Sequence, residues 1–336
     1  MAPVKRSRSN TPSKGRKVAA TAAGGNLLPC LQLGKKGNPV LVLLAGYPDD
    51  MSSGWGLTNL KTLSEEYRLI CLALPGYDKP RTAVRSWGWD LPEIVKALHH
   101  TIQFYLAEEN VTTYSMIVHD WGAYLGLCYQ NIYPQEINKM VLFDVGIVTK
   151  PPLLDSLRIV FYQWYFALSF AFSQLFSVTI ANVSLLFFFL FVSWTPLGPC
   201  PHDRVPRPRQ EVDIQQAYPY WYFWFGPNGY IRKGPRNMMR PSLTKLLAPI
   251  SLTNGTSTSS PSSASAVSTK LKTRKCPVFF MYGTQKNVMF HSKHFVDTLN
   301  KTEGCRVKGF ACGHWVILSK HNEEIMKQMK QFLGAN

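Results

Sequence analysis

The strongest constraint on the fold of this chain is the alternation of short apolar runs with helix-like stretches. Five runs rich in Val, Leu, Ile, Met or Phe occur, at 39–46, 68–74, 114–118, 139–145 and 277–282. Runs of this length and composition are typical of buried strands. Helix-like stretches such as 91–107 and 122–132 lie between several of them. Strands that alternate with helices predict an α/β fold with a mostly parallel sheet and helices on both faces.

A long insertion interrupts this alternation, because the strand pattern stops after residue 150 and resumes near 276. The first segment of the chain is basic and has few apolar residues, which is typical of disorder. We therefore expect four parts: a disordered tail at 1–25, a first part of the core at 26–150, a lid insertion at 151–275 and a second part of the core at 276–336.

The insertion itself consists of three unlike segments. Residues 159–201 are 43 residues without Asp, Glu, Lys or Arg, and they are dense in Phe, Tyr, Trp and Leu. Residues 202–249 are rich in Pro and Arg and contain an aromatic cluster at 218–225. Residues 251–274 form a Ser/Thr-rich tract that cannot build a core, so we expect a flexible loop there. The lid as a whole is expected to be largely helical.

The positive charge of the chain is concentrated outside the expected core. The sequence has 37 Lys and Arg against 20 Asp and Glu, a net charge of +17. Residues 1–20, 203–245 and 270–275 together contribute 15 of these charges. No nucleic-acid recognition motif accompanies them, so we expect no nucleic-acid partner. Basic residues on both sides of an apolar segment instead favour the surface of an anionic membrane.

The apolar segment of the lid also bears on the membrane. A helix that is apolar all round is either deeply buried or in lipid. Segments 159–176 and 178–195 have 18 residues each, near the minimum of about 17 needed to cross a bilayer. The two parts of the core must lie on the same side, which excludes a single crossing and leaves a hairpin, a re-entrant loop or an interfacial helix.

We therefore expect a membrane-associated protein that faces the cytoplasm, with a soluble cytoplasmic protein that has an apolar substrate tunnel as the alternative. The seven cysteines show neither metal-ligand spacing nor a disulfide pattern, which fits a reducing compartment and predicts no metal site.

Three chemically reactive residues follow expected strands. Asp120 follows the run at 114–118 and leads directly into a helix, Asp144 follows 139–143, and His314 follows a short β-like stretch near the end of the chain. Reactive groups in open parallel sheets gather at the carboxyl ends of the strands. A strand, a sharp turn that carries one reactive side chain, and a helix make up a nucleophile elbow. The sequence therefore predicts an elbow at Asp120.

Four motifs in this order resemble those of one family. They are AGYPDD, LPGYDKP, HDWG and GHW, and together they identify the chain as similar to α/β-hydrolases of the epoxide hydrolase and haloalkane dehalogenase branch. The resemblance covers about 26–150 and 276–333. It implies an α/β-hydrolase fold with an inserted lid. No G-x-S-x-G sequence occurs, which disfavours a serine esterase.

The resemblance implies a hydrolase that opens a lipophilic epoxide to a diol with water and without a metal or organic cofactor. Asp120 would attack the substrate and form an alkyl-enzyme ester, and His314 would activate the water that hydrolyses this ester. The backbone N–H groups of Tyr47 and Trp121 would form the oxyanion hole. The structural alternatives are a helix N-cap for Asp120 and an ordinary buried histidine for His314.

The acid that orients the histidine departs from the family pattern. Its usual place, in the sequence MYGTQKNV, is occupied by Lys286. A lysine cannot accept a hydrogen bond from imidazole, and its charge would lower the pKa of a nearby histidine. Some dehalogenases place the acid after the preceding core strand, where this chain has Asp144. We assign Asp144 as the orienting acid, with a turn-forming or capping aspartate as an equal alternative.

The lid tyrosines depart from the pattern as well. Tyr162 occupies the position of the first tyrosine that donates to the epoxide oxygen, although an aromatic residue of an apolar helix is an equal alternative. Pro235 takes the place of the second. Tyr47 stands where many dehalogenases have a halide-binding Asn, which favours an epoxide over a halide. Two rival functions stay open: a hydrolase of the same branch for lipid-like or halogenated substrates, and a non-catalytic lipid- or partner-binding protein.

Overall fold

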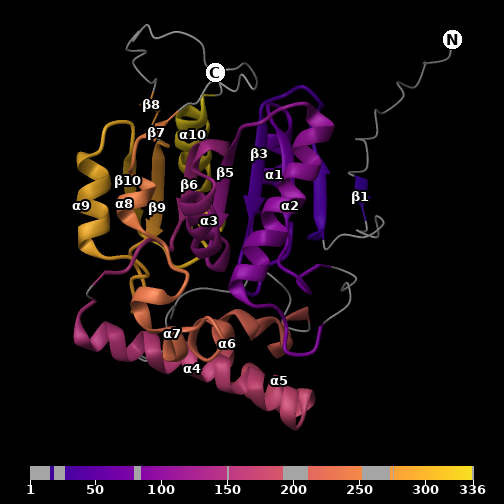
Figure 1. Ribbon diagram of the computed structural model, residues 1–336, viewed down its shortest axis with the longest axis vertical. Coiled ribbons are helices and arrows are strands. Elements are labelled where there is room, and N and C mark those ends of the chain that lie inside the picture. Colours follow the sequence, from indigo (N-terminus) through magenta and orange to yellow (C-terminus); the bar gives the residue numbers. More distant parts are fainter. Residues whose placement is uncertain are drawn as a thin grey trace, which may run out of the picture.

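The computed structural model describes residues 16–18, 27–78, 85–149, 151–191, 211–251, 273–274 and 276–334. An eight-stranded sheet forms its centre, in the order β1-β2-β4-β3-β5-β6-β9-β10 (Figure 1). The strands are β1 (Arg16–Val18), β2 (Cys30–Leu33), β3 (Val40–Leu44), β4 (Arg68–Leu72), β5 (Tyr114–His119), β6 (Ile137–Phe143), β9 (Val278–Gly283) and β10 (Arg306–Phe310). The five runs identified from the sequence are β3, β4, β5, β6 and β9, which confirms the expected α/β-hydrolase fold.

The sheet is parallel from β4 to β10, and only β1–β2 and β2–β4 are antiparallel pairs. All five residues of β3 and of β4 are buried, as expected for strands covered on both faces. In the register of the sheet, Leu44 pairs with Val118, His119 pairs with Phe143, and Phe143 pairs with Met281. The carboxyl ends of β3, β5, β6 and β9 therefore lie side by side.

Helices flank the sheet on its two sides. They are α1 (Leu57–Ser64), α2 (Leu91–Glu109), α3 (Trp121–Ile132), α9 (Lys293–Lys301) and α10 (Asn322–Leu333). α2 packs against α3, and α1 contacts α10 through a hydrogen bond between the side chains of Asn322 and Asn59. The start of α2 is fixed by a capping box, in which the side chains of Asp90 and Glu93 each accept a backbone N–H of the other.

The lid is defined here as the described residues between 151 and 251, and its helices between residues 153 and 237 lie across one end of the sheet (Figure 1). Its elements are α4 (Leu153–Leu175), α5 (Val178–Leu190), η4 (Ile214–Ala217), α6 (Tyr218–Trp224), α7 (Tyr230–Asn237) and α8 (Leu243–Leu246), followed by β7 (Ile250–Ser251), which pairs with β8 (Thr273–Arg274). Figure 1 shows α4 and α5 as the outermost layer. The side chain of Ser177 accepts the N–H of Ile180 and so caps α5.

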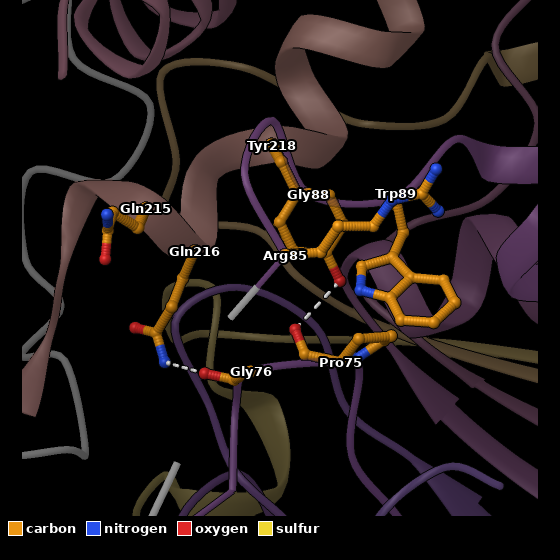
Figure 2. A pocket seen from close by; sticks show the side chains of 8 residues that line it. All are labelled: Pro75, Gly76, Arg85, Gly88, Trp89, Gln215, Gln216 and Tyr218. Carbon is orange, nitrogen blue, oxygen red and sulfur yellow. Dashed lines mark hydrogen bonds between the residues drawn. The ribbon is translucent and has the colours of Figure 1, made fainter. Parts of the chain in front are cut away.

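The lid is joined to the core at a small pocket (Figure 2). The hydroxyl of Tyr218 donates to the carbonyl of Pro75 at 3.1 Å, and Nε2 of Gln216 donates to the carbonyl of Gly76 at 3.2 Å. The pocket has a volume of about 10 Å³, enough for about one water molecule. It contains none of the predicted site residues, and its hydrogen bonds hold η4 and α6 on the loop after β4.

Three expectations concern segments that are described only in part. The expected tail at 1–25 lies outside the described residues except for β1, which is an ordered strand paired with β2. The expected loop at 251–274 lies outside them except for the β7–β8 pair. The expected apolar segments form α4 and α5, and α5 ends at Leu190. Across the described ranges, no helix has both the length and the apolar character needed to span a bilayer.

Candidate active site

Asp120 stands at the tip of the turn between β5 and α3. Its φ angle is +54°, a strained value for a residue that is not glycine and one typical of a nucleophile elbow. The alternative of a helix N-cap does not hold, because the side chain makes no capping hydrogen bond to α3. Its Oδ1 instead accepts the backbone N–H of Tyr47 at 2.8 Å. The carboxylate is therefore turned toward the loop after β3.

Two glycines allow the β3 loop to approach the elbow this closely. A Cβ atom on Gly122 would lie 2.1 Å from the carbonyl oxygen of Leu44. A Cβ atom on Gly46 would lie 2.3 Å from both Oδ1 of Asp120 and the backbone nitrogen of Trp121. Of the two N–H groups predicted for the oxyanion hole, that of Tyr47 is bonded to the Asp120 carboxylate, and the backbone nitrogen of Trp121 lies close to Gly46.

His314 lies between two carboxylates. Its Nδ1 is 2.5 Å from Oδ2 of Asp144, and its Nε2 is 3.4 Å from Oδ2 of Asp120. Asp144 follows β6 and is held in place by its own N–H, which donates to the carbonyl of Met281, and by the N–H of Gly283, which donates to its Oδ1. The structure thus brings together the three residues that the sequence proposed as nucleophile, base and orienting acid.

Lys286 reaches the same carboxylate. Its Nζ lies 2.6 Å from Oδ1 and 2.7 Å from Oδ2 of Asp144, and both side chains are fully buried. Burial alone would raise the pKa of Asp144, but the charges of Lys286 and His314 outweigh it and hold this pKa well below its usual value. Asp144 is therefore a permanent anion shared by two cationic side chains. Lys286 therefore acts on the carboxylate that His314 uses.

The two carboxylates determine the protonation of His314. Burial lowers the pKa of this histidine, but Asp144 and Asp120 outweigh it and raise the pKa to about 10. His314 is therefore an imidazolium at neutral pH while Asp120 is a carboxylate. It can become a base only when one of its two anionic neighbours loses its charge.

The substitution Asp120→Asn is expected to lower the pKa of His314 below about 10. Removing one neighbouring carboxylate destabilises the imidazolium, so the proton leaves at a lower pH. The measurement is a titration of the His314 ring followed by NMR. Asp297→Asn, which removes an exposed carboxylate paired with Lys293, is the control and should leave the titration unchanged. An identical His314 titration in wild type and Asp120→Asn would contradict the electrostatic account.

Two buried groups beside the site were not identified from the sequence. Asp49 accepts the indole N–H of Trp315 at 2.8 Å, and burial raises its pKa to about 7. The ring of His119 lies 4.5 Å from that of His314, and Nε2 of His119 is 3.2 Å from the carbonyl oxygen of His314. Burial and the charge of His314 lower the pKa of His119 to about 4, so it is neutral. The only sequence feature that could have indicated a role for Asp49 and His119 is that they lie within the motifs AGYPDD and HDWG.

Two lid tyrosines lie near Asp120. Tyr162 of α4 is buried and lines a cavity together with Asp120. Tyr220 of α6 is buried between rings, with centroid distances of 5.0 Å to Trp121 and 6.0 Å to Tyr162. Burial and then the proximity of Tyr162 and Asp120 raise the pKa of Tyr220 well above its usual value, so its hydroxyl keeps its proton. The sequence marked an aromatic cluster at 218–225 but assigned Tyr220 no role. Pro235 lies in α7 and also lines the cavity.

The cavity between lid and core has a volume of about 1190 Å³. This exceeds the range of about 300–1,000 Å³ usual for small-molecule sites. Asp120 and Trp121 lie on its core side, and its walls include apolar side chains of α4, α6 and α8, among them Ile159, Phe223 and Leu243. Within the described ranges, no group of three or more His, Cys, Asp or Glu residues is arranged to hold a metal ion.

Comparison with known structures gives the same architecture. A Bacillus megaterium epoxide hydrolase superposes with a TM-score of 0.59 at 15% identity and covers 92% of this chain and 98% of its own. A putative epoxide hydrolase from Klebsiella pneumoniae gives 0.56 at 14% identity, covering 95% and 97%. A haloalkane dehalogenase variant from Bradyrhizobium elkanii gives 0.56 at 13% identity, covering 91% and 92%. At these identities the likeness concerns the fold alone.

The family of the chain follows from a comparison of its sequence. No curated protein sequence matches the chain significantly. A profile of the alpha/beta hydrolase family matches residues 41–328, which include the elbow, the lid and the histidine. Because this match covers most of the chain and agrees with the observed fold, the chain belongs to the alpha/beta hydrolase family.

Proposed function

We propose that the protein opens lipophilic epoxides to diols through an ester of Asp120. The observation that carries this proposal is the position of the Asp120 carboxylate, whose Oδ1 is held by the N–H of Tyr47 and whose Oδ2 lies 3.4 Å from Nε2 of His314. A carboxylate at an elbow can attack saturated carbon without first losing a proton. The small substrate and water expected for a hydrolase would meet at this carboxylate, beneath a large cavity with apolar walls.

The first step forms the ester. An oxygen of Asp120 bonds to a ring carbon of the epoxide, and the carbon–oxygen bond of the ring breaks, with its electron pair passing to the ring oxygen. Tyr162 lines the same cavity as Asp120, and Tyr220 lies close enough to Asp120 for the charge of that carboxylate to raise its pKa. They would donate hydrogen bonds to the ring oxygen, through which it receives its proton.

The second step uses the change in charge that the first step causes. Once Asp120 is an ester, His314 retains only Asp144 as an anionic neighbour, and its pKa falls. Its proton passes to the tyrosinate that the first step leaves. The neutral imidazole then takes a proton from water, and the resulting hydroxide attacks the ester carbonyl. The N–H groups of Tyr47 and Trp121 would hold the oxyanion of the tetrahedral intermediate. When it collapses, the ester carbon–oxygen bond breaks and the departing alkoxide takes the proton of the new carboxylic acid. The diol is released, Asp120 is again a carboxylate that holds one oxygen of that water, and His314 is again an imidazolium.

The experiment that tests this proposal is a single turnover in ¹⁸O-water with excess enzyme and a long-chain terminal epoxide such as 1,2-epoxydodecane. The expected result is ¹⁸O in the peptide that contains Asp120 and unlabelled diol in the first turnover, because the water oxygen enters the carboxylate. Folded protein that gives diol with the label in the diol alone, or gives no diol, would rule out the ester mechanism.

The substitutions Tyr162→Phe and Tyr220→Phe are each expected to slow ester formation by about 10²-fold, the order of magnitude for loss of one donor to a developing oxyanion. The measurement is the single-turnover rate at which the Asp120 ester appears. Tyr165→Phe is the matched control, because the hydroxyl of Tyr165 donates to the carbonyl of Ser184 inside the lid. A wild-type rate in Tyr220→Phe would remove Tyr220 from the mechanism.

A further inference from the structure

The outer surface of α4 and α5 is apolar. Six side chains on these helices form a surface that we call the lid face: Phe161, Leu168, Phe172, Ile180, Val183 and Phe187. Their exposed fractions lie between 38% and 62%. They recur at helical spacing along each element, so they form one stripe per helix. Ordinary surface helices place charged and polar residues on this side, whereas residues 159–191 contain no Asp, Glu, Lys or Arg.

The three amide side chains of the same helices are bonded inside the protein. Oε1 of Gln163 accepts the indole N–H of Trp224 at 2.8 Å, Oε1 of Gln174 accepts the N–H of Trp87 at 3.2 Å, and Oδ1 of Asn182 accepts the N–H of Ile214 at 2.8 Å. The amides are satisfied inside the lid while Phe, Leu, Ile and Val face outward. This arrangement is the reverse of a water-facing helix and is the one expected where the outer medium is apolar.

Basic residues lie on α7, a lid helix that ring contacts connect to α4. Trp164 of α4 contacts Trp224 of α6 at a centroid distance of 5.9 Å, and Trp224 contacts Tyr230 of α7 at 5.1 Å. On α7, Arg232, Lys233 and Arg236 are exposed. A lid that presents both apolar side chains and cations matches the boundary between acyl chains and anionic headgroups. A second copy of the chain fits this surface less well. In a two-fold dimer the same patch of both copies would meet, which would bring two sets of these cations to one interface. The lid face has no acidic residue to pair with them.

We infer that the lid face lies in the interfacial layer of an anionic lipid bilayer. α4 and α5 would lie along the membrane plane with their apolar stripes among the acyl chains, and α7 would place its cations at the headgroups. Trp164 and Tyr230, at the border between the two, are residue types that favour this depth. Neither helix crosses the bilayer in this arrangement. The opposite side of α4 lines the cavity through Ile159 and Tyr162, so one helix separates lipid from substrate. The inference does not depend on the chemistry at Asp120.

The test is flotation of the full-length purified protein with vesicles of phosphatidylcholine containing 30% phosphatidylserine, compared with vesicles of phosphatidylcholine alone. We expect wild type to float with the anionic vesicles and Phe172→Glu/Phe187→Glu to lose at least tenfold in binding. Both positions are exposed, so the fold should tolerate the change. The matched control is Leu57→Glu/Ile132→Glu, at exposed apolar positions of α1 and α3, which should float as wild type does.

A second measurement needs no charged substitution. Brominated acyl chains quench tryptophan fluorescence on contact, so vesicles that contain them should quench wild type more strongly than Trp164→Phe. Wild type that stays out of the anionic vesicle fraction, a Glu variant that floats equally well, or equal quenching of Trp164→Phe would each overturn the inference. A wild-type dimer that the Glu pair converts to monomers, without vesicle binding, would assign the lid face to a second copy instead.

Discussion

His314→Gln is expected to stop the reaction at the Asp120 ester after one turnover. Asp120 attacks without a base, so the ester should still form, whereas its hydrolysis requires His314 to take a proton from water. Loss of a general base typically slows the step it assists by about 10²–10⁴-fold. Lys286 still neutralises Asp144 in this variant, because it binds both oxygens of that carboxylate. The site should therefore keep its geometry.

The measurement is the intact mass of the protein after addition of one equivalent of epoxide. We expect a gain equal to the mass of the epoxide, located in the peptide that contains Asp120, with multiple turnover abolished. His294→Gln is the matched control, since His294 is a second histidine that lines the same cavity, and it should turn over as wild type does. Asp120→Asn/His314→Gln should show no added mass. Wild-type turnover by His314→Gln would show that the base is another group.

The strands and the elbow could be predicted because they depend on local patterns. A buried strand has a recognisable apolar run, and the sharp turn at Asp120 has a recognisable neighbour in Gly122. Asp144 could be predicted because parallel strands align their carboxyl ends, and the register of β5, β6 and β9 has that effect. These inferences need only the strand order and the side-chain period.

The remaining features depend on contacts that local sequence does not encode. Tyr220 reaches the site because η4 and α6 are held on the loop after β4 by hydrogen bonds from Tyr218 and Gln216. Nothing in the spacing of the lid residues indicates this contact. The ion pair of Lys286 could not be predicted from local sequence either, because its partner Asp144 lies 142 residues away in the chain. β1 was missed because a three-residue strand has too few residues to show a period.

Four groups of the site carry charges that balance one another. Asp120 and Asp144 supply two negative charges, and Lys286 and protonated His314 supply two positive charges. Formation of the ester removes one negative charge, so a proton then leaves His314 more readily. Lys286 neutralises the charge of Asp144 whether or not His314 is protonated. His314 can therefore lose its proton without leaving an isolated buried anion.

Lys286→Met is therefore expected to destabilise the fold and to slow hydrolysis of the ester. Removal of one partner from a buried ion pair leaves an uncompensated charge and costs about 3–5 kcal/mol of the free energy of unfolding. With His314 as the only cation on Asp144, the imidazolium is stabilised further, and the pKa of His314 rises. Because the neutral form is the base, the pH at which ester hydrolysis reaches half its maximum rate should move upward. Urea unfolding and the pH–rate profile of that step measure the two effects.

Asp144→Asn/Lys286→Met separates these two effects. Both charges of the pair are removed, so we expect most of the lost free energy of unfolding to return. Activity should stay low, because the imidazole has lost the acid that orients it, a loss of up to about 10⁴-fold in triads of this kind. Lys293→Met is the control, since it breaks an exposed pair with Asp297, and it should change neither property. If Lys286→Met unfolds at the wild-type urea concentration and keeps the wild-type pH profile, the lysine neither neutralises Asp144 nor acts through it on His314.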